Sequence, residues 1–181
     1  MDDVLAPEGV SVERMDFPYR RAGRRAPDRP AVLVAAVREE AARLAEKSGL
    51  PPERIMLGGR SMGGRMCSTA AAEGLACLGL VLVSYPLHPP GKPERQRTEH
   101  FPALDVPCLF VSGSRDAFAT PAELEAATAT IPGPVTLVVL EGGDHGLRGK
   151  DTAVAAIVRD WVVATARTPK NEADPAKRPR D

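Results

Sequence analysis

The chain has 181 residues, 43% of them hydrophobic, which is enough for one domain with a sizeable core. Its 24 lysines and arginines balance its 24 aspartates and glutamates, so charge gives no reason to expect nucleic acid or an acidic membrane as a partner. No apolar run approaches the ~20 residues of a membrane-spanning helix. The first residues, Met1-Asp2-Asp3, do not resemble a signal peptide, and we expect a cytoplasmic protein.

The three cysteines, Cys67, Cys77 and Cys108, lie in apolar stretches and are expected to be small core residues in a reducing compartment. No spacing of cysteines or histidines indicates a metal site. We expect neither a metal nor another cofactor.

In chain order, the first expected strand covers residues 10–16, and a proline- and arginine-rich connection follows it. Residues 30–47 are predicted to form a helix, because Pro30 can open it and Gly49 can end it. Continuous apolar runs, typical of a parallel sheet covered on both faces, predict further strands at 54–57, 78–84, 106–111 and 134–140.

Helices are predicted between these strands and after the last one. Residues 120–123 have the pattern of a capping box with proline at the first helical position. The last helix carries an apolar stripe that places Trp161 in the core. Residues 86–104 are predicted to form a long polar loop, and 168–181 a disordered tail, which leaves 1–167 as the folded domain.

The motif Gly-x-Ser-x-Gly around Ser61 carries the most information about function. An apolar run precedes it and a good helix sequence follows it, which is the context of a nucleophile elbow. We expect glycine to be required at Gly59 and Gly63, where a Cβ would collide with the neighbouring turn. The motif alone could also be an ordinary glycine-rich turn, but the spacings of phosphate-binding loops and dinucleotide fingerprints are absent.

A nucleophilic serine needs a base, and the base needs an acid that orients it. Asp116 follows the strand expected at 106–111, and His145 follows the strand expected at 134–140. Both residues therefore fall at the carboxyl ends of strands, where open parallel sheets place their sites. We expect Ser61, Asp116 and His145 to meet there.

Other residues compete for these roles. His88 and His100 are alternative bases, but neither follows a strand end in the required order. Asp144 is an alternative acid, although an acid next to its histidine in sequence cannot easily reach the imidazole from behind.

The chain resembles the alpha/beta-hydrolase superfamily, and more narrowly a bacterial group of predicted hydrolases similar to dienelactone hydrolase. Animal relatives of that group include testis-expressed protein 30 and a subunit of a histone-acetyltransferase complex. The resemblance rests on residues 17–19, 58–65, 84–92, 113–116 and 143–145. It implies a three-layer, mostly parallel sheet, with Ser61 as nucleophile, Asp116 as acid and His145 as base. It implies no particular substrate.

The resemblance also implies two donors for an oxyanion. One is the backbone N–H of Met62, and the other comes from a glycine-rich loop after an earlier strand, which does not precede the motif here. We therefore expect a shortened form that lacks the N-terminal strands of the fold. In that form residues 1–8 would be the remains of a helix, and hydrolysis would be impaired.

The sequence thus predicts a serine hydrolase acting on a small-molecule ester or thioester through an acyl-enzyme. We expect the loop over 85–101 to overhang the site, and Arg60, His88 and Lys92 to bind substrate. The alternative is a weakly active or non-catalytic interaction domain, with the loops at 86–104 and 20–29 as surfaces for a protein partner.

Overall fold

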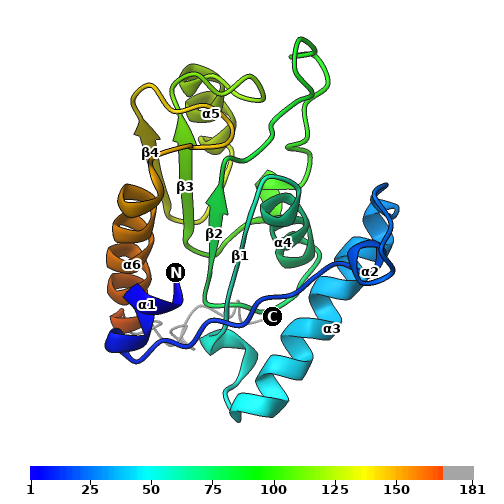
Figure 1. Cartoon of the computed structure of the whole chain (residues 1–181), viewed down its shortest axis with the longest axis vertical. Helices are drawn as coiled ribbons and strands as arrows, with labels where there is room; N and C mark the ends of the chain where they lie inside the picture. The colour runs from blue at the N-terminus through cyan, green and yellow to red at the C-terminus, as the bar shows by residue number, and fades with distance from the viewer. Residues whose placement is uncertain (169–181) are drawn as a thin grey trace, which may run out of the picture.

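The computed structural model describes residues 1–168 and centres on a parallel sheet (Figure 1). The strands follow one another in space as in the chain, in the order β1 (Met56–Arg60), β2 (Gly79–Val83), β3 (Cys108–Gly113) and β4 (Val135–Leu140). Since all pairings are parallel, the carboxyl ends of the strands share one edge of the sheet. The loops that leave this edge therefore lie close together.

Helices cover both faces of the sheet. One face carries α3 (Pro30–Ser48), α4 (Met62–Ala72) and α5 (Pro121–Thr128), and the other carries α1 (Asp2–Leu5) and α6 (Asp151–Arg167). The remaining elements are short. They are the helix α2 (Pro18–Arg21) and three 3-10 turns, η1 (Ala6–Glu8), η2 (Pro52–Arg54) and η3 (Phe101–Ala103). The expected three-layer α/β fold is confirmed.

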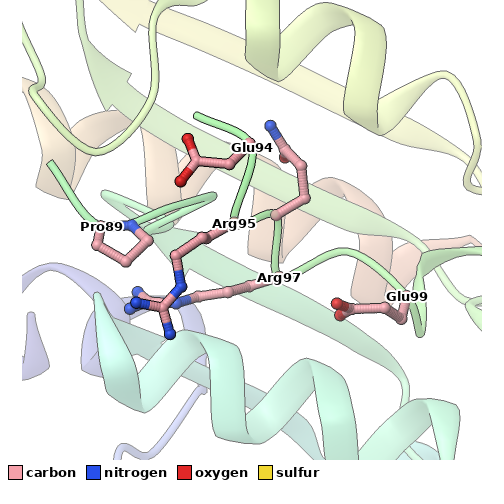
Figure 2. A pocket seen from close by; sticks show the side chains of 6 residues that line it. Pro89, Glu94, Arg95, Arg97 and Glu99 are labelled. Carbon is pink, nitrogen blue, oxygen red and sulfur yellow. The ribbon is translucent and has the colours of Figure 1, made fainter. Parts of the chain in front are cut away.

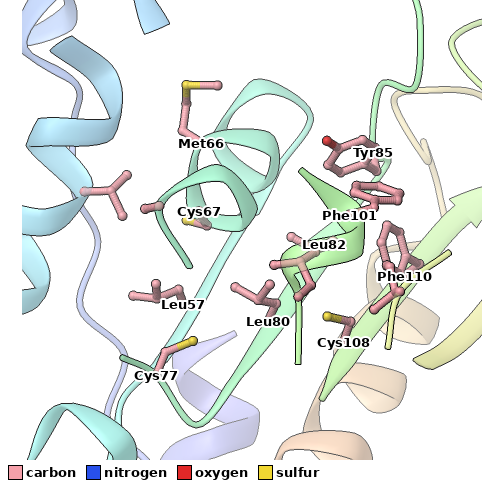
Figure 3. Close-up of a cluster of buried hydrophobic side chains, with 14 of the residues drawn as sticks. Leu57, Met66, Cys67, Cys77, Leu80, Leu82, Tyr85, Phe101, Cys108 and Phe110 are labelled. Atoms are coloured by element: carbon pink, nitrogen blue, oxygen red, sulfur yellow. The ribbon is translucent and has the colours of Figure 1, made fainter. Parts of the chain in front are cut away.

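The core alternates between the two faces along the strands. Leu80 and Leu82 of β2 and Phe110 of β3 are almost fully buried on the α4 side, where they pack with Tyr85 and Phe101 (Figure 3). The intervening residues of β3 are equally buried against α6 on the opposite face. Continuous apolar sequence in these strands is thus explained by burial on both sides.

Several predicted elements form within a residue or two of their expected bounds. The helix expected over 30–47 is α3. The capping box at the start of α5 is complete: the Thr120 side chain accepts from the backbone N–H of Glu123, and the Glu123 side chain accepts from the backbone N–H of Thr120. Trp161 packs against the core on the α6 face. Residues 18–21, expected in a connection, form the short helix α2, with Pro18 at its first position.

The strand expected over 10–16 is wrong, because this segment pairs with no strand of the sheet. Val10 and Val12 pack against the core on the α6 face, whereas Met15 packs against the core on the α3 face. The segment therefore crosses from one face to the other and passes β1 on the way (Figure 1). Its apolar side chains are half-buried against the two cores, but its backbone pairs with no strand of the sheet.

A cavity of about 570 Å³ lies between this segment and β1; we call it the β1 groove. Its walls come from residues 9–13, from β1 itself, from Leu44 of α3 and from Val158 and Val162 of α6. Within residues 1–168, β1 pairs with β2 alone, so its other edge presents backbone N–H and C=O groups without a sheet partner.

Cys67, Cys77 and Cys108 are buried thiols, as expected of core residues. Burial raises the pKa of the Cys67 thiol to about 12, so it stays protonated and unreactive near neutral pH. The tail predicted over 168–181 lies, except for Thr168, outside the described residues.

Candidate active site

Ser61 occupies the turn between β1 and α4, with φ 52° and ψ −120°. A non-glycine residue with positive φ is strained by roughly 1–3 kcal/mol and needs its surroundings to hold it. Two backbone hydrogen bonds do so: the Ser61 N–H donates to Val83 at 2.9 Å, and the Ser61 carbonyl accepts from Arg65 at 3.1 Å. The strain is the kind expected of a nucleophile elbow.

The glycines around Ser61 permit the close approach of β1 to α4. A Cβ on Gly59 would lie 2.7 Å from the backbone of Gly63 and Gly64, and one on Gly64 would lie 2.7 Å from the Gly59 carbonyl. A Cβ on Gly63 would meet nothing within 4 Å, so the requirement predicted for Gly63 is wrong and belongs to Gly64. The close approach is between β1 and the first turn of α4, and Gly64 is the helix residue that faces the strand.

Met62 is the first residue of α4. Its N–H is therefore one of the groups that a helix leaves without an intrahelical acceptor, and the positive end of the helix dipole lies beside Ser61. Negative charge that develops next to Ser61 would be favoured at this position.

Asp116 follows β3 in the loop at the carboxyl edge of the sheet, and its side chain is fully buried. The Phe118 N–H donates to its Oδ1 at 2.8 Å, and the Ser112 hydroxyl lies 3.5 Å from its Oδ2. These contacts orient the carboxylate toward the loop that follows β4.

His145 in that loop connects Asp116 to Ser61. Its Nδ1 lies 2.9 Å and 2.8 Å from the two carboxylate oxygens of Asp116, and its Nε2 lies 2.9 Å from the Ser61 Oγ. The His145 side chain is 26% exposed, so solvent reaches the imidazole, whereas the Asp116 carboxylate is inaccessible to solvent. The structure thus brings the three residues together in one hydrogen-bonded chain.

The loops that carry Asp116 and His145 are tied to each other. The Arg115 guanidinium donates to the Gly142 carbonyl at 2.7 Å and 3.2 Å, and the Arg115 N–H donates to Gly143 at 2.9 Å. A Cβ on Gly113 would lie 2.2 Å from the Gly143 carbonyl, so only glycine allows this approach. The separation of acid and base is thereby fixed by backbone contacts.

The competing residues lie elsewhere. The His100 Nε2 is 2.8 Å from the Ser68 hydroxyl, and burial lowers the pKa of this imidazole. The His88 Nδ1 faces its neighbour Pro89, and its Nε2 lies 3.4 Å from Glu123. Asp144 is exposed beside His145, and its carboxylate accepts from the Arg148 N–H at 3.4 Å.

The three residues expected to bind substrate are not gathered into one cluster. The Arg60 guanidinium donates to the Gly146 carbonyl and so ties the elbow to the histidine loop. His88 is only 5% exposed, whereas Lys92 is exposed near the tip of the loop after β2. A role for these side chains in substrate binding stays a prediction.

The loop after β2 was expected to be polar, but both of its ends are buried. Leu87 at its start and Phe101 and Leu104 at its end are inaccessible to solvent. The His88 N–H donates to the Phe118 carbonyl at 3.2 Å, so the loop begins directly beside the acid loop.

The position of Phe118 at the site and the strained backbone of Ser84 were not predicted from the sequence. The Phe118 ring lies 4.1 Å from the His145 ring, centre to centre, and covers one face of the imidazole. Ser84 has φ 50° and is fully buried at the end of β2. No local pattern marks either feature, because each depends on a contact between segments distant in sequence.

We predict that His88→Ala destabilises the protein whereas Lys92→Ala does not. His88 is buried and contacts Glu123, so its loss should cost about 1–2 kcal/mol, or roughly 2–8 °C in Tm for a chain of this size. Lys92 is exposed, and its loss should change Tm by less than about 1 °C. Thermal unfolding by circular dichroism measures both variants, and equal Tm values would contradict the buried position of His88.

Within residues 1–168, no cluster of three histidine, cysteine, aspartate or glutamate side chains is arranged to hold a metal ion. The same residues contain no helix with the length and apolar character needed to cross a bilayer.

Comparison with known proteins identifies the family. The family model described as "Alpha/beta hydrolase domain" matches residues 1–165. The chain belongs to the alpha/beta hydrolase family. The narrower likeness to the dienelactone hydrolase and testis-expressed protein 30 group stays a prediction.

One curated protein similar to this alpha/beta hydrolase domain is the pimeloyl-[acyl-carrier protein] methyl ester esterase of Stenotrophomonas maltophilia (strain K279a). The two are 35% identical over 63 residues, which are 35% of this chain and 24% of the esterase. The chain thus matches about a quarter of that relative's length.

Solved structures share the fold at low sequence identity. Est1E from Butyrivibrio proteoclasticus is 15% identical, with a TM-score of 0.65 over 78% of this chain and 72% of that one. An alpha-beta serine hydrolase homologue from Coxiella burnetii is 19% identical, with a TM-score of 0.56 over 78% and 62% of the two chains. At these identities the likeness establishes the fold alone.

Proposed function

We propose that the protein is a serine hydrolase that cleaves a carboxylic ester or thioester through an acyl-enzyme. The observation that carries this proposal is the chain of hydrogen bonds from Ser61 through His145 to Asp116, with contacts of 2.8–2.9 Å. Membership of the alpha/beta hydrolase family and the partial match to a methyl ester esterase support it.

In the first half of the reaction, the Ser61 hydroxyl attacks the carbonyl carbon of the substrate. Its proton passes to the His145 Nε2, while the Nδ1–H donates to Asp116 and the carboxylate stabilises the imidazolium. The tetrahedral intermediate then collapses, and the proton on Nε2 leaves with the alcohol or thiol. Ser61 remains acylated.

In the second half, His145 takes a proton from water, and the resulting hydroxide attacks the acyl carbon. The proton returns to the Ser61 oxygen as the carboxylic acid leaves, so the enzyme is regenerated. The backbone N–H of Met62 at the start of α4 stabilises the oxyanion in both halves. Ester or thioester is preferred as the substrate bond because no dedicated peptide-binding element is found within residues 1–168.

We further propose that hydrolysis is slow, since Met62 is the one donor that we assign to the oxyanion. The lining of the β1 groove extends to Arg60, the residue before Ser61, and water in the groove would raise the local dielectric and weaken hydrogen bonds to developing charge.

The proposal predicts that a fluorophosphonate probe labels wild-type protein covalently and that Ser61→Ala is not labelled. Ser61 is activated by His145, whereas the Ser68 hydroxyl is buried against His100. Gel fluorescence and mass spectrometry of the labelled peptide measure the site, with Ser68→Ala as the matched control that keeps the label.

Labelling that persists in Ser61→Ala would contradict the assignment of the nucleophile. A wild-type protein that is folded but takes no label would instead favour the alternative, a non-catalytic interaction domain.

A further inference from the structure

A second cavity, of about 380 Å³, lies in the loop after β2, away from the β1 groove. Figure 2 shows Arg95 and Arg97 reaching from this loop over helix α4, with Glu94 and Glu99 to either side of them. The cavity is lined almost entirely by polar and charged side chains, which is typical of a site for a charged group rather than an apolar one.

Arg65 of α4 adds a third positive charge beneath the loop. Burial and the positive charges of Arg65 and Arg95 lower the pKa of the Arg97 guanidinium, so Arg97 lies within electrostatic range of both. The Arg65 Nε is buried and has no hydrogen-bond partner in the described part of the chain. Among residues 1–168, none of the three guanidiniums forms an ion pair with a carboxylate.

In the described part of the chain, the Glu94 and Glu99 carboxylates that line the same cavity pair with none of these guanidiniums, so a bound anion would offset positive charge that the glutamates balance only in part. A guanidinium offers donors in a planar fork that fits the oxygens of a carboxylate or a phosphate. This effect is greatest for Arg65 and Arg97, which are half-buried, since partial burial reduces screening by water.

The loop is held in place over α4 by contacts that do not use the arginine side chains. The Tyr85 hydroxyl donates to the Arg97 carbonyl at 2.9 Å, and His100 contacts Ser68 of α4 at 2.8 Å. Both anchor residues pack against Phe101. The backbone that carries Arg97 is therefore fixed over α4, and a side-chain substitution at 95 or 97 leaves these anchors intact.

Arg65 is the member of the cluster whose backbone lies close to Ser61. Arg65 lies one turn along α4 from Ser61 and its N–H donates to the Ser61 carbonyl at 3.1 Å, so the two Cα atoms are about 6 Å apart along the helix axis. A charged group on a short acyl or alcohol arm of a substrate would then extend from a carbonyl at Ser61 toward Arg65.

We propose that Arg65, Arg95 and Arg97 form an anion subsite that binds a carboxylate or phosphate group on the substrate cleaved at Ser61. The favoured substrates are then esters or thioesters with a negatively charged group a short arm away from the scissile bond. The assignment of the anion to a substrate rests on the proposed function, whereas binding of the anion itself does not.

Binding is tested by isothermal titration calorimetry with inorganic phosphate and with adipate at constant ionic strength. We expect at least one anion to bind wild-type protein and to bind Arg97→Gln and Arg95→Gln about tenfold more weakly each. The charge-matched control is Arg54→Gln, which removes an exposed arginine just before β1, at the end of the strand opposite Ser61. It should bind the anion as wild type does. The tighter of the two anions identifies the group. No binding of either anion, or an equal loss in the Arg54 control, would overturn the subsite.

Its link to catalysis is tested with two p-nitrophenyl esters of equal chain length, the hexanoate and the monoester of adipate. The ratio of kcat/KM for the adipate ester over the hexanoate should exceed one in wild type and in Arg54→Gln, and fall about tenfold in Arg97→Gln. An unchanged ratio would contradict the subsite even if both esters are cleaved. Anion binding without hydrolysis of either ester would instead contradict the proposed function and leave the subsite supported.

Discussion

Asp116→Asn is expected to lower kcat for a p-nitrophenyl ester about 10⁴-fold, the scale of the corresponding change in other hydrolases with this triad. The Asp116 carboxylate accepts from His145 Nδ1 at 2.8–2.9 Å and is fully buried. An asparagine amide in its place can donate to Nδ1, which favours the imidazole tautomer with its proton on Nε2. That tautomer cannot accept the proton of Ser61.

The matched control is Asp144→Asn. Asp144 adjoins His145 in sequence and has the same charge, but it is exposed and contacts the Arg148 N–H instead of the imidazole. We expect less than a threefold change in kcat, within the range of ordinary surface substitutions. Steady-state kinetics and thermal unfolding of both variants separate catalysis from stability. A comparable loss of kcat in the two variants would contradict Asp116 as the acid.

The sequence predicts the geometry around Ser61 well because that geometry is local. A strand, a glycine-flanked serine and a helix are consecutive in the chain, and the strained φ of Ser61 follows from that order. Asp116 and His145 are also placed by a general rule, since loops after parallel strands meet at one edge of the sheet. Even so, the requirement for glycine that the motif predicts at Gly63 is found at Gly64. The reason is that the close contact with Gly59 depends on how α4 packs against β1.

Features that depend on distant contacts were not predictable. Phe118 covers the His145 ring through a contact between two loops, and His88 is buried although its loop reads as polar. The arginine cluster is a further case, because Arg65 and Arg97 are distant in sequence and the charge of Arg65 acts on Arg97 only when the loop folds back over α4.

The prediction of a strand over residues 10–16 is wrong for a different reason. Val10 and Val12 do pack their side chains against the core and are half-buried there, as is expected of a strand at the edge of a core. A strand also needs a neighbour for its backbone, and the β1 groove separates this segment from the open edge of β1. Side-chain periodicity reports burial and not pairing, so sequence alone could not distinguish a strand from an extended segment that wraps the edge.

The open edge leads to the last prediction. A chain extended upstream of Met1 by a strand, a glycine-rich loop and a connecting helix should cleave a p-nitrophenyl ester at least ~100-fold faster, the scale of one oxyanion donor. The added strand would pair with the free edge of β1 in the β1 groove, which is about 570 Å³ and lined by Val158 and Val162 among others. Its loop would then emerge at the same edge of the sheet as Ser61 and present a second N–H beside that of Met62.

The control is an extension of identical length in which the donor residue of the loop is proline, which has no N–H. Both extensions should raise Tm, because each covers the groove and satisfies the edge of β1, but only the first should raise kcat. This separation distinguishes an oxyanion effect from a general gain in stability. Equal kcat in the extended and unextended chains would show that residues 1–168 already supply a second donor, and that Met62 does not act alone.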